Sequence, residues 1–94
     1  DTKNRVLRTE TVSIGTLDSS LVHPREVYRI VVREGAASWI AVHNHPSGDP
    51  TPSPEDIAIT QRLKEAGELL GVPLLDHLIL GDGNYTSLRE RGYL

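Results

Sequence analysis

The chain contains no cysteine and no phenylalanine, and it has only one tryptophan and three tyrosines. Without cysteine, disulfide bonds and cysteine-ligated zinc sites are excluded, so any bound metal has to use His, Asp or Glu. With so few aromatic side chains, the core is expected to be aliphatic and built from Leu, Ile and Val. At 94 residues the chain is long enough for one compact domain and too short for two.

A basic stripe and a long apolar run are also lacking. The net charge is −3 and no cluster of Lys and Arg stands out, whereas proteins that bind nucleic acid usually carry such a cluster to displace counterions. No apolar run approaches the ~20 residues needed to span a bilayer, and no signal-peptide pattern opens the chain. We therefore expect a soluble cytoplasmic protein with no direct nucleic-acid or membrane partner.

The first part of the chain is expected to hold a strand and a helix. Asp1–Asn4 has the composition of a turn, Arg5–Ile14 that of a strand and Gly15–Val22 that of a connecting loop. A chain that opens on a turn implies an earlier strand that leads into it. Pro24 suits the first position of a helix, since proline lacks the N–H that would be unpaired there, and Gly35 is expected to end that helix.

A strand, a long helix and two further strands are expected after the first helix. Trp39–Val42 is apolar at every residue, as in strands covered on both faces, and it leads into His43. A helix is expected over Pro54–Leu70, stopped by the glycine that follows. Strands at Leu74–Leu80 and Tyr85–Leu88, joined by a glycine-rich turn, complete the order. This pattern predicts a single α/β domain with a mixed β-sheet flanked by helices.

Two histidines stand at the end of the predicted buried strand. Residues two apart on a strand project from the same face, so His43 and His45 are expected to point into one space. Each imidazole offers a nitrogen that can bind zinc at ~2.0–2.1 Å. For an isolated His-x-His pair there is an alternative, in which one His forms a hydrogen bond in the core and the other faces solvent.

The helix that follows supplies a third candidate ligand. Ser53 and Asp56 take the first and last places of a capping box, worth ~1 kcal/mol at the Ser alone. Capping alone does not account for Asp56, because at about 100° per residue it lies about 20° from Leu63 around the helix axis. It therefore extends the inward stripe formed by Ile59, Leu63, Ala66 and Leu70. A buried carboxylate is costly without a partner, and a cation would supply one.

The three candidate ligands have the chemistry of a catalytic zinc site. Two His and one carboxylate leave the fourth position open for water, and zinc lowers the pKa of that water to around 7. The spacing is specific as well. It matches the His-x-His-x7-Ser-x-x-Asp motif of the JAMM (MPN+) metalloproteases through His43-Asn44-His45, Ser53 and Asp56.

Flanking segments extend the resemblance to nearly the whole chain. The string His43–Pro50, with His23–Glu26 before it and Asp76–His77 after it, is similar to the bacterial RadC family. The resemblance implies a three-layer α/β fold of the JAB/MPN, cytidine-deaminase-like kind for residues 1–94, lacking its N-terminal strand. It also implies a zinc-dependent metallo-hydrolase that uses an activated water to cut a peptide or isopeptide amide, with a peptide or protein as substrate.

The resemblance also assigns roles to individual residues. Zinc would be held by His43, His45 and Asp56, and Ser53 would stabilise the oxyanion of the tetrahedral intermediate. In the family a glutamate moves the proton from the water to the leaving amine, and its position lies before this chain begins. Glu10 and Glu26 are available acids, but neither occupies that position.

Asp76 and His77 are adjacent on a predicted strand, so they are expected to face opposite sides of the sheet. One of them can serve as the hydrogen-bond partner of a zinc-bound His. The alternative is a buried polar pair that is satisfied by the backbone.

Two other functions remain open at this point. One is a non-catalytic protein-interaction module of MPN fold, although such modules generally lose the ligands that this chain keeps. The other is an accessory role in DNA repair or recombination. Because the chain is acidic, a protein partner would then have to make the contact with DNA.

Overall fold

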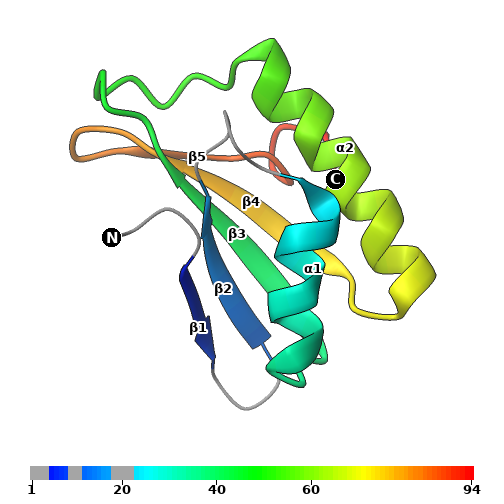
Figure 1. The fold of residues 1–94 in the computed structure, drawn as a ribbon. Coiled ribbons are helices and arrows are strands. Elements are labelled where there is room, and N and C mark those ends of the chain that lie inside the picture. The colour runs from blue at the N-terminus through cyan, green and yellow to red at the C-terminus, as the bar shows by residue number, and fades with distance from the viewer. Residues whose placement is uncertain (1–4, 9–11, 18–22) are drawn as a thin grey trace.

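The computed structural model describes residues 5–8, 12–17 and 23–94, with side chains described from His23 onward. Two helices and five strands lie within these ranges (Figure 1). They are β1 (Arg5–Arg8), β2 (Val12–Leu17), α1 (Pro24–Arg33), β3 (Ser38–Asn44), α2 (Pro54–Leu70), β4 (Leu74–Leu80) and β5 (Tyr85–Ser87). Neither described helix is long and apolar enough to cross a membrane.

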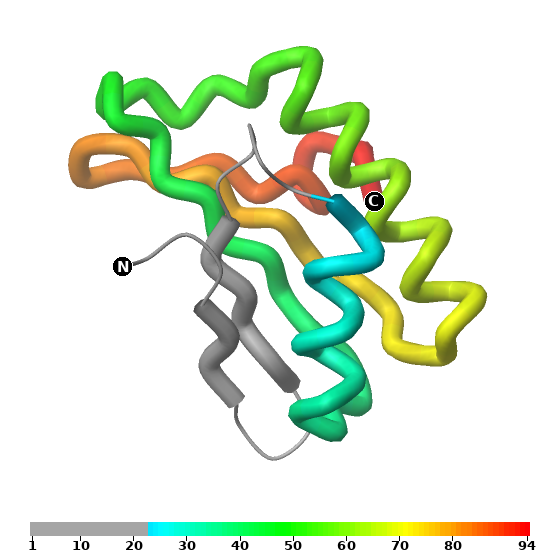
Figure 2. Tube along the Cα trace, in the orientation of Figure 1, coloured from blue at the N-terminus to red at the C-terminus, as the bar shows by residue number. Residues whose placement is uncertain are grey.

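The strands form one mixed sheet in chain order, β1-β2-β3-β4-β5. The three central strands run parallel, and the outer strands β1 and β5 pair antiparallel with their neighbours. Because the parallel strands follow one another across the sheet, two crossovers of the same hand place α1 and α2 on the same face (Figures 1 and 2). The predicted α/β domain with a mixed sheet is confirmed. Within the described ranges no helix covers the opposite face, so these ranges show two of the three expected layers.

Both helices begin and end where local sequence signals predicted. Helix α1 begins at Pro24 and is followed by Gly35 at φ 69°. Helix α2 begins after Ser53, whose hydroxyl oxygen accepts a hydrogen bond from the Asp56 N–H, and ends at Gly71 at φ 75°. A positive φ is readily adopted only by glycine, which is why both helices stop where a glycine occurs.

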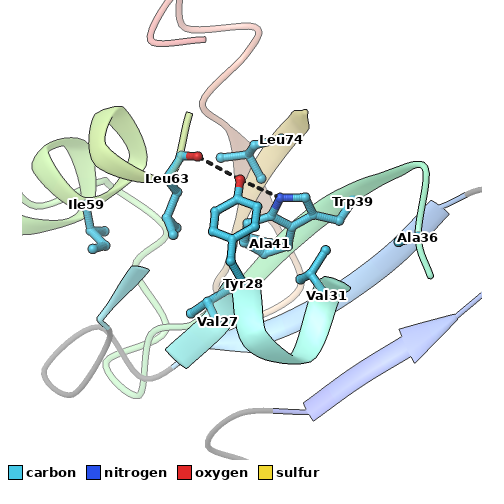
Figure 3. Close-up of a cluster of buried hydrophobic side chains, with 9 residues drawn as sticks. All are labelled: Val27, Tyr28, Val31, Ala36, Trp39, Ala41, Ile59, Leu63 and Leu74. Atoms are coloured by element: carbon cyan, nitrogen blue, oxygen red, sulfur yellow. Dashed lines mark hydrogen bonds between the residues drawn. The ribbon is translucent and has the colours of Figure 1, made fainter. Parts of the chain in front are cut away.

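The core between the helices and the sheet is centred on an aromatic pair (Figure 3). The rings of Tyr28 and Trp39 meet edge to face, with centroids 5.3 Å apart at 82°. The Trp39 Nε1–H donates to the Tyr28 hydroxyl at 2.9 Å, and this hydroxyl donates to the Leu63 carbonyl oxygen at 2.7 Å. Most of the core is aliphatic, as expected, but the expectation of a core built from Leu, Ile and Val omits these two aromatic residues. Each buried ring brings a polar group, and both groups are satisfied inside the core.

The prediction of one long strand over Arg5–Ile14 is also wrong. The structure has two antiparallel strands there, with Leu7 opposite Ile14, and β2 continues to Leu17 through part of the predicted loop. Scattered apolar residues mark an extended chain but do not reveal where it reverses, so one strand and a hairpin look alike in the sequence. The expected turn at residues 1–4 lies outside the described residues.

One position of the inward stripe on α2 is misassigned. Ile59 and Leu63 are buried and Ala66 packs against the core, but Leu70 is 55% exposed. The chain that follows α2 fills that end of the core, since Val72 and Leu74 both pack there. The last turn of α2 therefore does not pack on the core, and Leu70 is left exposed.

Candidate metal centre

The candidate ligands meet where β3 ends and α2 begins. Strand β3 ends one residue before His45, but the His45 N–H donates to the Leu80 carbonyl oxygen at 3.0 Å and extends the ladder to β4. His43 and His45 therefore share one face, with ring centroids 4.7 Å apart. Asp56 faces them from the first turn of α2 and is completely buried. Potential ligand atoms of these three residues all lie within 4.8 Å of one another.

The hydrogen bonds of His45 determine which ring nitrogen faces the centre. Nδ1 lies 2.8 Å from the Asp49 carbonyl oxygen, which can only accept, so Nδ1 carries a proton. In a neutral ring Nε2 then presents a lone pair, and this atom lies 3.0 Å from Oδ2 of Asp56. An N–H donated to a backbone carbonyl is the usual support of a metal-binding His, because it directs the other nitrogen to the ion.

Both carboxylate oxygens of Asp56 face polar atoms. Oδ2 accepts the Ser53 N–H at 2.7 Å, which completes the capping box, and Oδ1 lies 3.0 Å from Nδ1 of His43. Burial acts to raise the pKa of Asp56, but hydrogen bonds from Ser53 and the neighbouring imidazoles outweigh it and hold that pKa below its usual value. The carboxyl group is therefore ionised at neutral pH. Capping and metal binding are compatible roles for this one side chain.

The arrangement fits a small cation. Lone pairs on His45 Nε2 and Asp56 Oδ2 would repel each other at 3.0 Å unless a proton or a metal ion lies with them. Metal–ligand bonds of about 2.0–2.1 Å in a tetrahedron give ligand–ligand separations of about 3.3 Å. Each imidazole approaches Asp56 to 3.0 Å, His43 at Oδ1 and His45 at Oδ2, which is close to that value, and one donor atom from each of the three residues lies within 4.8 Å of the others. Two imidazoles and one carboxylate also match the donor set of catalytic zinc sites.

The other acids weighed for catalysis do not join this group. Glu26 is exposed on α1 and pairs with Arg29 at 3.0 Å, beside a surface cavity that His23 and Arg62 also line. Glu10 lies outside the described residues. Ser53 does lie beside the group, one turn from Asp56 and hydrogen-bonded to it.

The turn between β4 and β5 supports the loop that follows His45 (Figure 2). The Asp82 N–H donates to the Gly48 carbonyl oxygen at 2.8 Å. A Cβ at Gly81 would fall against that same carbonyl and within 2.8 Å of Pro50, so only glycine allows the approach. The glycine-rich turn expected between these strands is therefore also a contact of the loop that follows His45, which its composition did not predict.

Asp76 and His77 face opposite sides of the sheet, as predicted. The Asp76 carboxylate accepts hydrogen bonds from the N–H groups of His77 and Arg89 and from the Ser87 hydroxyl, so it ties β4 to the end of β5 and to the segment after it. His77 points to the helical face, is completely buried and stacks on His43, with ring centroids 6.1 Å apart. Asp76 is thus a structural group, whereas His77 lies behind the candidate ligands.

Burial makes His77 a pH-dependent element of stability. Burial, together with the charge of His43, lowers the pKa of His77 from 6.5 to about 4. Between these values the unfolded chain binds a proton that the folded chain does not, so stability should fall as pH drops from 6.5 toward 4. A pKa shift of this size corresponds to about 3 kcal/mol of stability.

Urea unfolding at several pH values should show this loss of stability, and His77→Gln should reduce it. The same change at the exposed His23 should leave the slope as it is, and equal slopes in all three proteins would contradict the prediction.

The fold and the site together define an α/β domain with a candidate three-ligand metal centre at the carboxyl end of its parallel strands. Residues 1–93 match the family described as the RadC-like JAB domain, and the chain belongs to that family. The resemblance drawn from the motif is thereby confirmed.

Similar proteins from several organisms carry only a family name. A UPF0758 protein of Desulforamulus reducens is 61% identical over 94 residues, which are the whole of this chain and 41% of that protein. UPF0758 proteins of Bacillus licheniformis (61% identical, 42% of its length) and Pelobacter propionicus (63% identical, 41% of its length) are also similar over the whole chain. The chain therefore spans about two fifths of the curated relatives it matches, and their names state no activity.

Proposed function

We propose that this domain is a zinc-dependent hydrolase that cleaves an amide bond in a peptide or isopeptide link. The observation that carries the proposal is the convergence of the buried His43, the half-buried His45 and the buried, ionised carboxylate of Asp56, with potential ligand atoms within 4.8 Å of one another. Such a set leaves a coordination position open, which structural sites with four protein ligands do not. Membership of a JAB family supports the same reaction class.

A bound zinc ion would supply a Lewis acid and a water of lowered pKa. His43, His45 and Asp56 would hold the ion, and the Asp49 carbonyl would keep His45 turned toward it. The half-buried Ser53 accepts the Asp56 N–H through its hydroxyl oxygen, which leaves the hydroxyl hydrogen to donate to an oxyanion. The N-terminus of α2 adds a positive potential at the same place.

A proton carrier is also required, because the leaving amine must be protonated. Glu26 is engaged with Arg29 and does not lie in the ligand group, so we assign this role to a group outside the described residues. The proposal therefore assigns the metal ligands and the oxyanion donor to described residues of this domain, and the acid–base group to none of them.

The test uses the protein stripped with a chelator and reloaded with one equivalent of zinc. Hydrolysis of a mixed peptide library and of isopeptide-linked substrates is followed by mass spectrometry. We expect cleavage that depends on zinc and is absent in His45→Ala. Failure to take up zinc would refute the proposal, and zinc uptake without cleavage of any substrate would favour the interaction module.

Replacing Ser53 by Ala should separate chemistry from metal binding. The variant loses the helix cap, about 1 kcal/mol of stability, and the proposed oxyanion donor, about 10²–10³ in kcat. Zinc affinity should stay near the wild-type value, because the Ser53 N–H that holds Asp56 is a backbone group. Unchanged turnover in the zinc-loaded variant would remove Ser53 from the mechanism.

A further inference from the structure

A third histidine lies one layer beneath the candidate ligands. His77 on β4 is paired in register with Ala41 on β3, and His43 with Ile79. Residues 41 and 43 project from the same face, so the His77 ring lies on the face of His43, at the level of the residue two positions before it on β3. The rings of His77 and His43 stack with centroids 6.1 Å apart and an interplanar angle of 29°. His77 is completely buried, so it is in place to support the site from below.

Hydrogen bonding of Thr60 fixes the orientation of this ring. Thr60 lies one turn after Asp56 and its hydroxyl contacts two groups, the Asp56 carbonyl oxygen at 2.6 Å and Nδ1 of His77 at 2.6 Å. A hydroxyl has one hydrogen, and the carbonyl can only accept, so this hydrogen goes to Asp56. The Thr60 oxygen must then accept from His77, which places the His77 proton on Nδ1.

The other ring nitrogen is consistent with this assignment. Nε2 of His77 is buried and has no hydrogen-bond partner among the described residues. A protonated Nε2 would be a buried donor without an acceptor, in addition to leaving Nδ1 and the Thr60 oxygen as two facing acceptors. Both nitrogens therefore point to the same tautomer.

We infer that His77 is a positioning residue, which donates from Nδ1 to Thr60 and so holds the first turn of α2, and with it the Asp56 carboxylate, in place on the sheet. The link runs from β4 through the Thr60 hydroxyl to the Asp56 carbonyl. Because it ends on the backbone of the residue whose carboxylate faces His43 and His45, its loss should loosen the ligand geometry. The inference rests on the proposed function only in treating Asp56 as a metal ligand.

The tautomer can be measured in the metal-free wild-type protein. Long-range ¹H–¹⁵N correlation spectra of the imidazole rings at pH 7 should show, for His77, a protonated Nδ1 and an unprotonated Nε2. A proton on Nε2 would overturn the inference. This measurement needs neither zinc nor a variant, so its outcome is independent of whether the protein is a hydrolase.

Matched variants test the coupling to Asp56. Thr60→Val removes the hydroxyl at nearly constant volume, and Thr60→Ser keeps it. In metal-free protein, amide hydrogen exchange of Asp56 and Ile57 should be roughly 3- to 10-fold faster in Thr60→Val than in the wild type. Exchange of the α1 amides should be unchanged, and Thr60→Ser should exchange at nearly the wild-type rate. His77→Asn, which keeps a donor at the δ position, should protect these amides better than His77→Gln. Equal exchange in all four variants would contradict a positioning role.

Zinc affinity gives the functional readout of the same variants. Loss of a supporting hydrogen bond behind a metal ligand typically weakens metal binding 10- to 100-fold, so Thr60→Val should fall in that range and Thr60→Ser should not. A Val variant that is less stable yet binds zinc like wild type would make the link purely structural and refute the inference. Absence of zinc binding by the wild type would refute the proposed function alone, since the exchange and tautomer data would still decide the role of His77.

Discussion

Replacement of Asp56 by Asn is expected to abolish zinc binding while the fold is retained. The substitution removes the negative charge that faces His43 and His45 at 3.0 Å, and an amide is a poor zinc ligand. We expect the zinc affinity to fall by more than the roughly 100-fold that an outer-shell loss costs at most. The Asn side chain still offers an oxygen to the Ser53 N–H, so capping should be little affected. Competition with a chromophoric chelator at pH 7 measures the affinity, and thermal unfolding measures the fold.

Glu55 provides the matched control for this experiment. It is the preceding residue on α2 and its side chain is exposed, so Glu55→Gln removes the same charge from the same turn without touching the centre. Zinc affinity should be unchanged in this variant. If Asp56→Asn instead lowered the melting temperature sharply and kept its zinc affinity, Asp56 would be a helix cap and not a ligand.

The candidate ligands could be identified from the sequence because they depend on short-range geometry. His43 and His45 are two residues apart on a strand, and Ser53 and Asp56 three apart at a helix start, so local periodicity alone places each pair. The helix ends were equally accessible, since Pro24, Ser53 and Gly71 act through their own backbone chemistry. What local signals do not supply is the distance between the two pairs, which depends on the intervening loop and on the packing of α2.

The features that were missed depend on contacts between distant segments. His77 meets Thr60 only because β3 and β4 pair with Ala41 opposite His77, and no periodicity within β4 encodes that register. Gly81 is needed because the turn after β4 packs against the loop after His45. The hairpin between β1 and β2 was missed for a related reason, since strand pairing is a long-range property that scattered apolar residues do not reveal.

Replacement of Leu63 by Ala is expected to cause the largest loss of stability on α2. Leu63 is completely buried against the aromatic pair of the core, and truncation of a buried Leu to Ala typically costs about 2–5 kcal/mol. A domain of this size has a free energy of unfolding of about 5–15 kcal/mol, so the loss is a large part of the total. Leu69→Ala, on the same helix but 88% exposed, should change the stability by no more than about 0.5 kcal/mol. Urea unfolding of the metal-free proteins measures both, and similar losses in the two variants would contradict the packing of α2.

Zinc should restore much of what Leu63→Ala loses, because a metal that binds only the folded state stabilises it by mass action. At a free zinc concentration of 1,000 times Kd this stabilisation is about 4 kcal/mol, comparable to the expected loss. Leu63 lies two turns from Asp56 on α2 and takes no part in the ligand set, so the variant should keep a near-native zinc affinity once folded. The double variant with Asp56→Asn should gain nothing from zinc. Recovery in the double variant would mean that zinc binds elsewhere and that the three-ligand centre is not the site.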